Sequence, residues 1–438
     1  MEHINAMLDE FLQTDNLNQQ QIQELQLQRL RETVDRARRA PWYDRVLGDT
    51  GIQVADIHSV DDVCKLPLTT KDDLRQAMPY GFLAVPLDDV VRMHYSSGTT
   101  GVATGVCHTH NDVRWWSECV ARGLHAAGVT RSDVFQNMMG YGLFTGGLGF
   151  HYASELIGCM TIPASAGNTQ RQVQLMRQFG TTVLHILPSY AVRVANYCIE
   201  NGLDPASDLS IRTVFVGGEP HSEHLRARIE QLFDCKSYNC YGLSEMAGPG
   251  VAMECPAQHG LHVREDHYLA EVLDPVTLEP VEPGERGELV LTSLRREAMP
   301  LLRYRTRDLT RFIPEPCPCG NSHCRIERIQ GRTDDMLIVK GVNIYPQQVE
   351  YVLMQMPEVG NNYLILLENP DNTDDMVVQV ELSPTIGVDD MRALRRIERQ
   401  LVDALHAELL MTPTVKLLQP NSLPAAEGKA VRVIDNRQ

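Results

Sequence analysis

The sequence has no long hydrophobic run, and this absence excludes the first class of protein. No apolar stretch comes near the roughly 18 residues that a membrane-spanning helix requires. The N-terminal segment MEHINAMLDEFLQTDN is acidic and lacks the apolar core of a signal peptide, so we expect a cytoplasmic protein with no membrane partner. Low-complexity tracts and internal repeats are absent too, and 438 residues suffice for a large core and two or three domains.

Positive charge is also scarce. The chain carries 40 Lys and Arg against 57 Asp and Glu, a net charge of −17, which argues against a nucleic-acid partner. The 11 cysteines are an odd number, and most of them stand singly. We therefore expect reduced thiols rather than a disulfide framework.

A lysine is missing from the segment YSSGTTGVATG, residues 95–105. Its glycines let backbone N–H groups converge on an anion and its hydroxyls add donors, so the segment predicts a phosphate-binding loop, although taken alone it fits a plain turn equally well. A Walker A loop is excluded, because that motif requires a Gly-Lys-Ser/Thr ending. Phosphoryl or nucleotidyl transfer develops negative charge that a cation must offset, so a lysine from elsewhere is needed.

The rest of the chain predicts an α/β fold. Residues 18–40 form an amphipathic pattern typical of a helix packed on the body of the protein. Between about residues 80 and 250, short apolar runs alternate with helical stretches, which indicates βαβ crossovers and a mainly parallel sheet. Residues 268–313 are typical of hairpins with Pro/Gly turns.

A second, smaller unit follows. It predicts a helix at 346–356, a strand pair at 362–367 and 376–382, a helix at 388–409 and a polar tail. We therefore expect a large N-terminal domain over residues 1–333, with mixed or parallel sheets and a hairpin-rich subdomain. A small mobile α+β domain would occupy residues 334–438.

Five further motifs accompany the glycine-rich loop in a fixed order: VFVGGEP (214–220), CYGLSEMAGPG (240–250), YRTRDLT (304–310), GRTDDMLIVKGVNIYPQQVE (331–350) and EGKAVRV (427–433). The ordered set resembles the adenylate-forming superfamily of acyl-CoA synthetases. Within it, YGLFTGGLGFHY (141–152), YGLSEMAGPGVAMEC (241–255) and GLHVREDHY (260–268) are most similar to phenylacetate–CoA ligases. That branch also lacks the loop lysine, and here Ala103 and Thr104 stand at its place.

The resemblance implies a nucleotide site. The β- and γ-phosphates of ATP would lie against Ser97, Gly98, Thr99, Thr100 and Gly101, and the adenine edge against Gly218, Glu219 and Pro220. Tyr241, followed by Gly242, would stack on the purine, and Ser244 would touch the α-phosphate. Glu245 would hold Mg²⁺, while Asp308 and Arg332 would bind the ribose. A solvated surface carboxylate is the alternative for each acid.

The same resemblance identifies the missing lysine and a hinge. Lys429, near the C-terminus on the small domain, would bridge the substrate carboxylate and the α-phosphate during adenylation. Asp334 occupies the place of the residue about which the small domain turns, and Lys340–Gly341 would then close on the pantetheine tunnel of coenzyme A. The alternatives are a solvent-exposed tail lysine and an ordinary Asp-Asp turn.

An acyl pocket is expected in the apolar, glycine-rich stretch at Tyr141, Phe144, Gly146 and Gly147. In phenylacetate–CoA ligases the glycines of this stretch leave room for a flat ring, which favours an aryl or arylacetic acid. A buried turn is the alternative.

A cysteine cluster predicts a tetrahedral S₃N zinc site at Cys255, His262, Cys317 and Cys319, with Cys324 and His259 as substitutes. It would join the loop after the Tyr241 turn to the loop after Asp308. Reduced cysteines in a turn are the equal alternative.

The expected activity is that of an AMP-forming acid–CoA ligase that uses ATP, Mg²⁺ and coenzyme A on a small carboxylic acid; a homodimer is left open. Two rivals remain: a stand-alone adenylation enzyme that loads a carrier-protein phosphopantetheine, and an inactive nucleotide-binding protein. Joint presence of Glu245, Asp308 and Lys429 opposes the second rival, since binding alone needs no such lysine.

Overall fold

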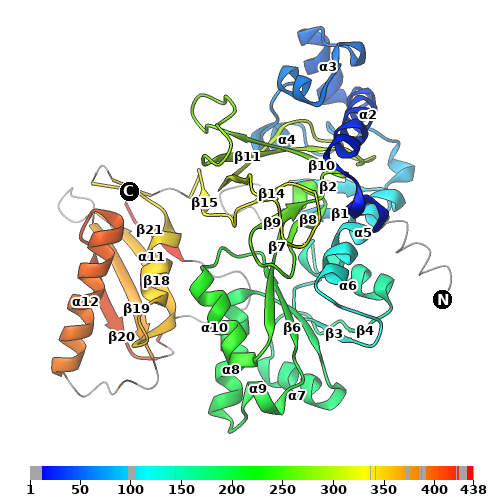
Figure 1. The fold of residues 1–438 in the computed structure, drawn as a ribbon. Coiled ribbons are helices and arrows are strands. Elements are labelled where there is room, and N and C mark those ends of the chain that lie inside the picture. Colours follow the sequence, from blue (N-terminus) through cyan, green and yellow to red (C-terminus); the bar gives the residue numbers. More distant parts are fainter. Residues whose placement is uncertain are drawn as a thin grey trace.

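The computed structural model describes residues 12–96, 104–143, 145–335, 337–340, 342–369, 375–383, 386, 391–420, 422–423 and 432–437. Figure 1 shows a large unit, coloured blue to yellow, with a smaller orange and red unit beside it. Within the described ranges, no helix is long and apolar enough to cross a membrane.

A mixed sheet of nine strands is the centre of the large unit. In spatial order the strands are β13 (Phe312–Ile313), β14 (Arg325–Ile326), β9 (Leu261–Val263), β8 (Gly248–Glu254), β7 (Lys236–Leu243), β6 (Thr213–Gly217), β5 (Val183–Ile186), β3 (Val134–Asn137) and β4 (Met160–Ile162). Pairing is parallel from β7 through β6, β5 and β3 to β4. On the other side of β7 it is antiparallel.

The mainly parallel sheet expected between about residues 80 and 250 is confirmed for β3 to β7, and the antiparallel strands of this sheet begin only at β8. β7 and β8 are joined by a single short turn, η5 (Ser244–Met246), whereas a parallel connection needs a crossover of a dozen or more residues. The same argument applies to β1 (Arg92–Tyr95) and β2 (Gly105–His108), which pair as an antiparallel hairpin around the glycine-rich loop.

Helices cover both faces of the parallel half. One face carries α5 (His110–Ala126) and α6 (Gly146–Ile157), and the other carries α7 (Thr169–Phe179), α8 (Pro188–Glu200) and α10 (Glu223–Phe233), with the short α9 (Pro205–Asp208) beside them. Because side chains alternate along a strand, Val183 and Phe215 pack with α5 and α6, while Leu184 and Val214 pack with the other helices. This double coverage explains the continuous apolar runs of these strands.

A second sheet, in the order β10-β11-β12-β15, and the N-terminal helices share another core. The strands are β10 (Tyr268–Leu273), β11 (Gly287–Ser293), β12 (Tyr304–Thr310) and β15 (Gly331–Arg332). The helices are α2 (Gln19–Ala37), α3 (Pro41–Thr50) and α4 (Lys71–Gln76), and short 3₁₀ turns are η1 (Thr14–Asn16), η2 (Val54–Asp56), η3 (Val60–Lys65) and η4 (Leu87–Asp89). The helix predicted within 18–40 is confirmed, and Asn18 caps it.

The small unit has a core of its own, to which Ile365, Val378 and Leu401 contribute. Its elements are β16 (Leu337–Val339), β17 (Val342–Ile344), α11 (Pro346–Met354), β18 (Val359–Glu368), β19 (Asp375–Leu382), α12 (Met391–Leu409), β20 (Thr414–Leu418) and β21 (Val433–Asp435). The sheet order is β20-β19-β18-β21. Both predicted helices and the strand pair are confirmed, whereas β20 lies in the segment expected to be a polar tail. A domain boundary at Asp334 stays a prediction.

Candidate active site

The proposed site residues gather at one edge of the parallel half-sheet. Gly218 and Glu219 follow β6, Ser244 and Glu245 follow β7, and the loop from residue 138 follows β3. Parallel neighbours place their carboxyl ends at the same edge, so these segments meet although they are far apart in sequence.

Four side chains form a continuous hydrogen-bonded chain beside this edge. The Tyr241 hydroxyl donates to Asp308 Oδ2 at 2.5 Å, and Arg332 Nη1 donates to Asp308 Oδ1 at 3.1 Å. Arg332 also makes a two-bond pair with Asp334, at 2.8 and 2.9 Å. Pairing of β12 with β15 sets Asp308 opposite Arg332, so the backbone register fixes this charge pair. Tyr241 and Asp308 are only 9% and 7% exposed, and burial followed by the Asp308 charge raises the pKa of Tyr241.

Glu245 has partners that the sequence did not predict. Thr104 Oγ1 donates to Glu245 Oε1 at 3.2 Å, and the ammonium of Lys71, at the start of α4, lies 3.3 Å from the same oxygen. Ser96 and Thr104 clamp the base of the glycine-rich loop, because their hydroxyls lie 2.7 Å apart and Ser96 N donates to Thr104 O at 3.0 Å. A cation therefore does lie close to this loop, on α4. A helix-capping pattern around Thr70 locates the start of α4, but no sequence signal points from Lys71 to Glu245.

The turn after β7 depends on close backbone approach. A Cβ at Gly242 would lie 2.0 Å from the Gly248 carbonyl oxygen, so only glycine fits at this position, where β7 pairs with β8. Beyond it, the Ser244 and Thr145 hydroxyls lie 3.3 Å apart, which joins this turn to the start of α6. Thr145 was not predicted.

The loop after β6 is held by another unpredicted residue. Ser189, in the first turn of α8, donates its hydroxyl to Glu219 Oε2 at 2.7 Å and its backbone N–H at 3.4 Å. Gly218 has φ of +77°, a conformation that favours glycine, and Gly218 and Pro220 are exposed at the surface.

The expected acyl-pocket residues lie between β3 and α6. Tyr141 Oη is 3.2 Å from His151 Nδ1, and burial raises the pKa of Tyr141 to about 12. A Cβ at Gly147 would lie 2.6 Å from the Gly140 carbonyl oxygen, and one at Gly146 would touch Met139 at 3.4 Å. The absent side chain of Gly147 thus permits close packing of α6 on the loop, which is a different reason for glycine from the room for a ring that the sequence suggested.

Several predicted residues lie outside the described part of the chain: Ser97, Gly98, Thr99, Thr100, Gly101, Phe144, Gly341 and Lys429. Lys340, beside one of them, directly follows β16, and its ammonium lies 3.5 Å from Asp375 at the start of β19. Their roles stay predictions.

Side chains of the two units meet at several points in the described part of the chain. The rings of His224 on α10 and Tyr351 on α11 meet edge to face with centroids 5.7 Å apart. Gln347 donates to the Ile329 carbonyl at 3.3 Å, just before the Arg332–Asp334 pair. Figure 1 shows α11 on the side of the small unit that faces α10.

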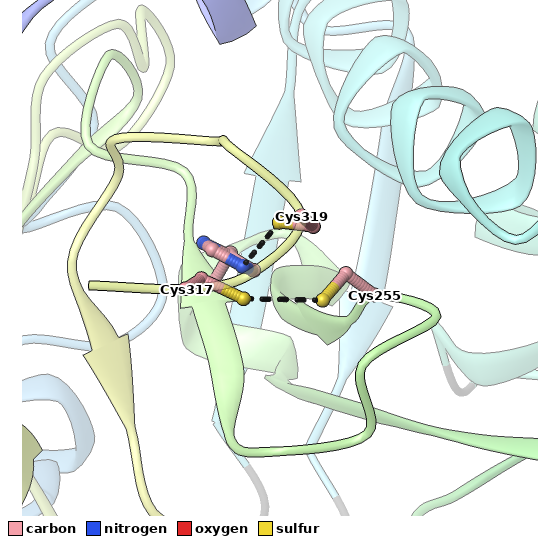
Figure 2. Close-up of side chains that lie close together, drawn as sticks. Cys255, Cys317 and Cys319 are labelled. Atoms are coloured by element: carbon pink, nitrogen blue, oxygen red, sulfur yellow. Dashed lines mark hydrogen bonds between the residues drawn. The ribbon is translucent and has the colours of Figure 1, made fainter. Parts of the chain in front are cut away.

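The four residues of the predicted metal site do come together. Ligand atoms of Cys255, His262, Cys317 and Cys319 all lie within 4.8 Å of one another. Figure 2 shows Cys255, Cys317 and Cys319 with their sulfur atoms close together. The two substitutes lie elsewhere: Cys324 N donates to Glu265 at 2.6 Å, and His259 is 3.2 Å from the guanidinium of Arg325.

Known proteins are similar to this chain in sequence and in fold. A model of the AMP-binding enzymes matches residues 24–294, and a model of the AMP-binding enzyme C-terminal domain matches residues 341–437. These two matches define the class, the adenylate-forming α/β enzymes. The phenylacetate-coenzyme A ligase of Thermus thermophilus is 42% identical over 443 residues, which cover 97% of this chain and 98% of that protein. The chain therefore belongs to the phenylacetate–CoA ligase family of AMP-forming acid–CoA ligases.

Two solved structures of another ligase differ in the orientation of the small unit, and this chain can be compared with both. A 2-hydroxyisobutyryl-CoA ligase in the postadenylation state, with an acyl-AMP, superposes with a TM-score of 0.91 at 27% identity, covering 97% of this chain and 91% of that one. The same ligase with acyl-AMP and CoA in the thioesterification state gives 0.72 at 28% identity, covering 97% and 92%. The present arrangement of the two units is thus close to the postadenylation arrangement.

Proposed function

We propose that the enzyme activates phenylacetate, or a closely similar arylacetic acid, and transfers it to coenzyme A. The substrate carboxylate attacks the α-phosphorus of ATP and pyrophosphate leaves; the CoA thiolate then attacks the acyl carbon and AMP leaves. The near-complete overlap with a 42% identical phenylacetate-coenzyme A ligase is the observation that carries the choice of acid.

Nucleotide binding is assigned to the hydrogen-bonded residues Tyr241, Asp308 and Arg332 and to the loop after β6. Tyr241 would stack on the purine while its hydroxyl, bonded to Asp308, fixes the ring. Asp308 would accept from the ribose hydroxyls, and Arg332 would add a donor. The adenine edge would lie against Gly218, Glu219 and Pro220, with Gly242 supporting the Tyr241 turn. Preformed contacts of this kind lower the ordering cost of binding.

Phosphate chemistry is assigned to the turn after β7 and to the loop that Ser96 and Thr104 clamp. Ser244 would touch the α-phosphate, and the segment Ser97–Gly101 would hold the departing pyrophosphate. Glu245 and the Thr104 hydroxyl offer hard oxygen donors 3.2 Å apart, a donor set that suits Mg²⁺. When bound, Mg²⁺ would offset the negative charge of the phosphates. Glu245 would exchange its Lys71 contact for that role.

The second half-reaction is assigned to a turn of the small unit about Asp334. Lys429 would serve adenylation, and Lys340–Gly341 would face the pantetheine in the other orientation. The Arg332–Asp334 pair, at 2.8 and 2.9 Å, spans the proposed hinge and would hold the present orientation. A boundary between domains at residues 333 and 334 follows from the same proposal. Tyr141, Phe144, Gly146 and Gly147 would line the acyl side.

The test is pyrophosphate release with phenylacetate, benzoates and fatty acids, with and without CoA. We expect phenylacetate to give the highest kcat/KM and to yield phenylacetyl-CoA only when CoA is present. A preferred fatty acid would overturn the choice of acid. Product formation on a holo carrier protein but not on CoA would favour the carrier-loading alternative. Family membership does not support the inactive binding protein. A cytoplasmic location, where ATP and CoA are at hand, belongs to the proposal.

A further inference from the structure

The Cys255 cluster has the dimensions of a metal site rather than of a disulfide. Cys255 Sγ and Cys317 Sγ are 3.6 Å apart, far beyond the roughly 2.05 Å of an S–S bond. Cys319 Sγ and His262 Nε2 are 3.4 Å apart. Around a tetrahedral Zn²⁺, bonds of about 2.3 Å to sulfur and about 2.05 Å to nitrogen give S–S and S–N edges of about 3.8 and about 3.6 Å. Both separations are close to those edges (Figure 2).

His262 is already oriented for a ligand. Its Nδ1 lies 3.1 Å from the His323 carbonyl, which can only accept, so Nδ1 carries the proton and Nε2 keeps a free lone pair. That lone pair is on the atom nearest Cys319.

Another buried cluster provides a contrast. Glu118, Asp266 and His267 also bring three ligand atoms together. There, however, Arg122 Nη1 donates to both oxygens of Asp266, at 2.9 and 3.1 Å, so a protein cation already balances the carboxylates. The Cys255 cluster has only soft donors around its centre, and three thiols with one imidazole select Zn²⁺ over Mg²⁺ or Ca²⁺.

We infer that the protein holds one structural Zn²⁺ through Cys255, His262, Cys317 and Cys319. Four protein ligands close the coordination sphere, so the ion has no open position for catalysis. It joins the β8–β9 turn to the loop between β13 and β14, two segments that pair only through short strands.

The same loop supports the N-terminal segment. Directly after Cys319, the Ser322 hydroxyl donates to the Leu17 carbonyl, and His323 Nε2 lies 3.2 Å from the Thr14 carbonyl. Between these two contacts, Asp15 pairs with the fully buried Arg122 at 2.5 Å. Loss of the ion would free the loop and, with it, the segment that covers Arg122.

The experiment is metal analysis of protein purified without a histidine tag. We expect about one zinc per chain in the wild type and in Cys64→Ser, a control that removes an exposed cysteine elsewhere. The double variant Cys317→Ser/Cys319→Ser should lose the zinc and melt at least about 5 °C lower. A strong chelator should lower the wild-type melting temperature toward that of the variant and leave the variant unchanged. Amide exchange over residues 12–18 should rise in both metal-free samples.

Metal exchange keeps the inference testable if the double variant does not fold. Wild-type protein exchanged into Co²⁺ should show thiolate-to-cobalt charge-transfer absorption and the intense visible bands of tetrahedral Co²⁺. Protein with reduced thiols and no bound metal would overturn the inference. A Cys255–Cys317 disulfide, or stoichiometric iron or copper in the same ligands, would also overturn the assignment to zinc.

Discussion

Asp308 and Tyr351 lie on the two units that form the site, and they are held in different ways. Asp308 is buried in paired strands and bonded to Tyr241 and Arg332 within the large unit. Tyr351 belongs to the small unit and touches the large unit through one ring edge on His224. The hydrogen bonds of Asp308 hold it firmly in the large unit, whereas the single ring contact between Tyr351 and His224 takes little free energy to break. A firmly held Asp308 beside a small unit that can turn is what the two proposed half-reactions would require.

Removing the proposed catalytic cation, Lys429, should have the largest effect on activity. We expect Lys429→Ala to lower acyl-adenylate formation by roughly a thousandfold or more, because no other proposed group bridges the carboxylate and the α-phosphate. Thioester formation from preformed acyl-AMP should persist. The measurement is rapid-quench analysis of each half-reaction, with Lys416→Ala on β20 as an exposed-lysine control. Equal loss in both half-reactions would contradict the assignment.

Substitution of the buried Asp308 should have the second largest effect. Asp308→Asn keeps the volume but removes the charge that faces Arg332, and truncating a buried charge pair costs about 2–5 kcal/mol. We expect kcat/KM for ATP to fall by roughly a hundredfold and the rate of thioester formation from acyl-AMP to fall less. Asp49→Asn, an exposed acid on α3, is the control. An unchanged KM for ATP would remove Asp308 from the ribose site.

Locking the proposed hinge should separate the two half-reactions. Proline fixes φ near −65°, so Asp334→Pro restricts the turn of the small unit. We expect a normal burst of acyl-AMP and a thioester rate lowered about a hundredfold, which is about 2.7 kcal/mol of barrier. Asp334→Ala loses the Arg332 pair but keeps the rotation, so it should retain thioester formation. Normal turnover by the proline variant would place the pivot elsewhere.

Acid should destabilise the large unit before the small one. Burial lowers the pKa of His185 and of His221 to about 3, below the ordinary value of about 6.5, so the unfolded chain takes up their protons first. Each such histidine costs the fold about 1.4 kcal/mol per pH unit as pH falls from about 6.5 toward 3. In the small unit, burial raises the pKa of Glu350, whose contribution is lost as pH rises instead.

The three tryptophans, Trp42, Trp115 and Trp116, all lie in the large unit and report on it alone. Their fluorescence should change at a higher pH than the amide exchange of α12 in the small unit. If α12 loses protection first, the ordering is wrong.

The smallest effect is expected at the contact between units. An exposed edge-to-face pair is worth about 0.5–1.5 kcal/mol, so Tyr351→Ala should change the ratio of the two half-reaction rates by about 2- to 10-fold. His224→Ala should act in the same direction. The double variant should add little to either single change, because both remove one contact. Additive effects would show that the rings do not act as a pair.

Much of the fold follows from local patterns. The amphipathic pattern of residues 18–40 predicted α2, and the pattern of the small unit predicted its two helices. The antiparallel half of the sheet could not be predicted, because β9, β13 and β14 are too short to show an alternation of apolar and polar residues. The four metal-site residues were predicted from spacing, and their side chains do converge.

The partners of the site residues could not be predicted. The contacts of Lys71 with Glu245 and of Ser189 with Glu219 join residues that are distant in sequence and carry no shared pattern. The Gly140 carbonyl oxygen takes the space beside Gly147, a packing reason for glycine that the sequence did not predict, while the place of Gly147 in the acyl pocket stays a prediction. Tertiary contacts of this kind depend on where whole elements dock, which local sequence does not encode.

The change of strand direction at β7 has a consequence for how this enzyme could diversify. The loop that would bind the acid follows β3, while the nucleotide loops follow β6 and β7, and all of them emerge at one edge from separate strands. Residues 138–142 could therefore change in composition without altering the register that sets Tyr241 or Asp308. Under the proposed roles, substrate preference would be separable from ATP use, and loop exchange after β3 would be a route to ligases for new acids.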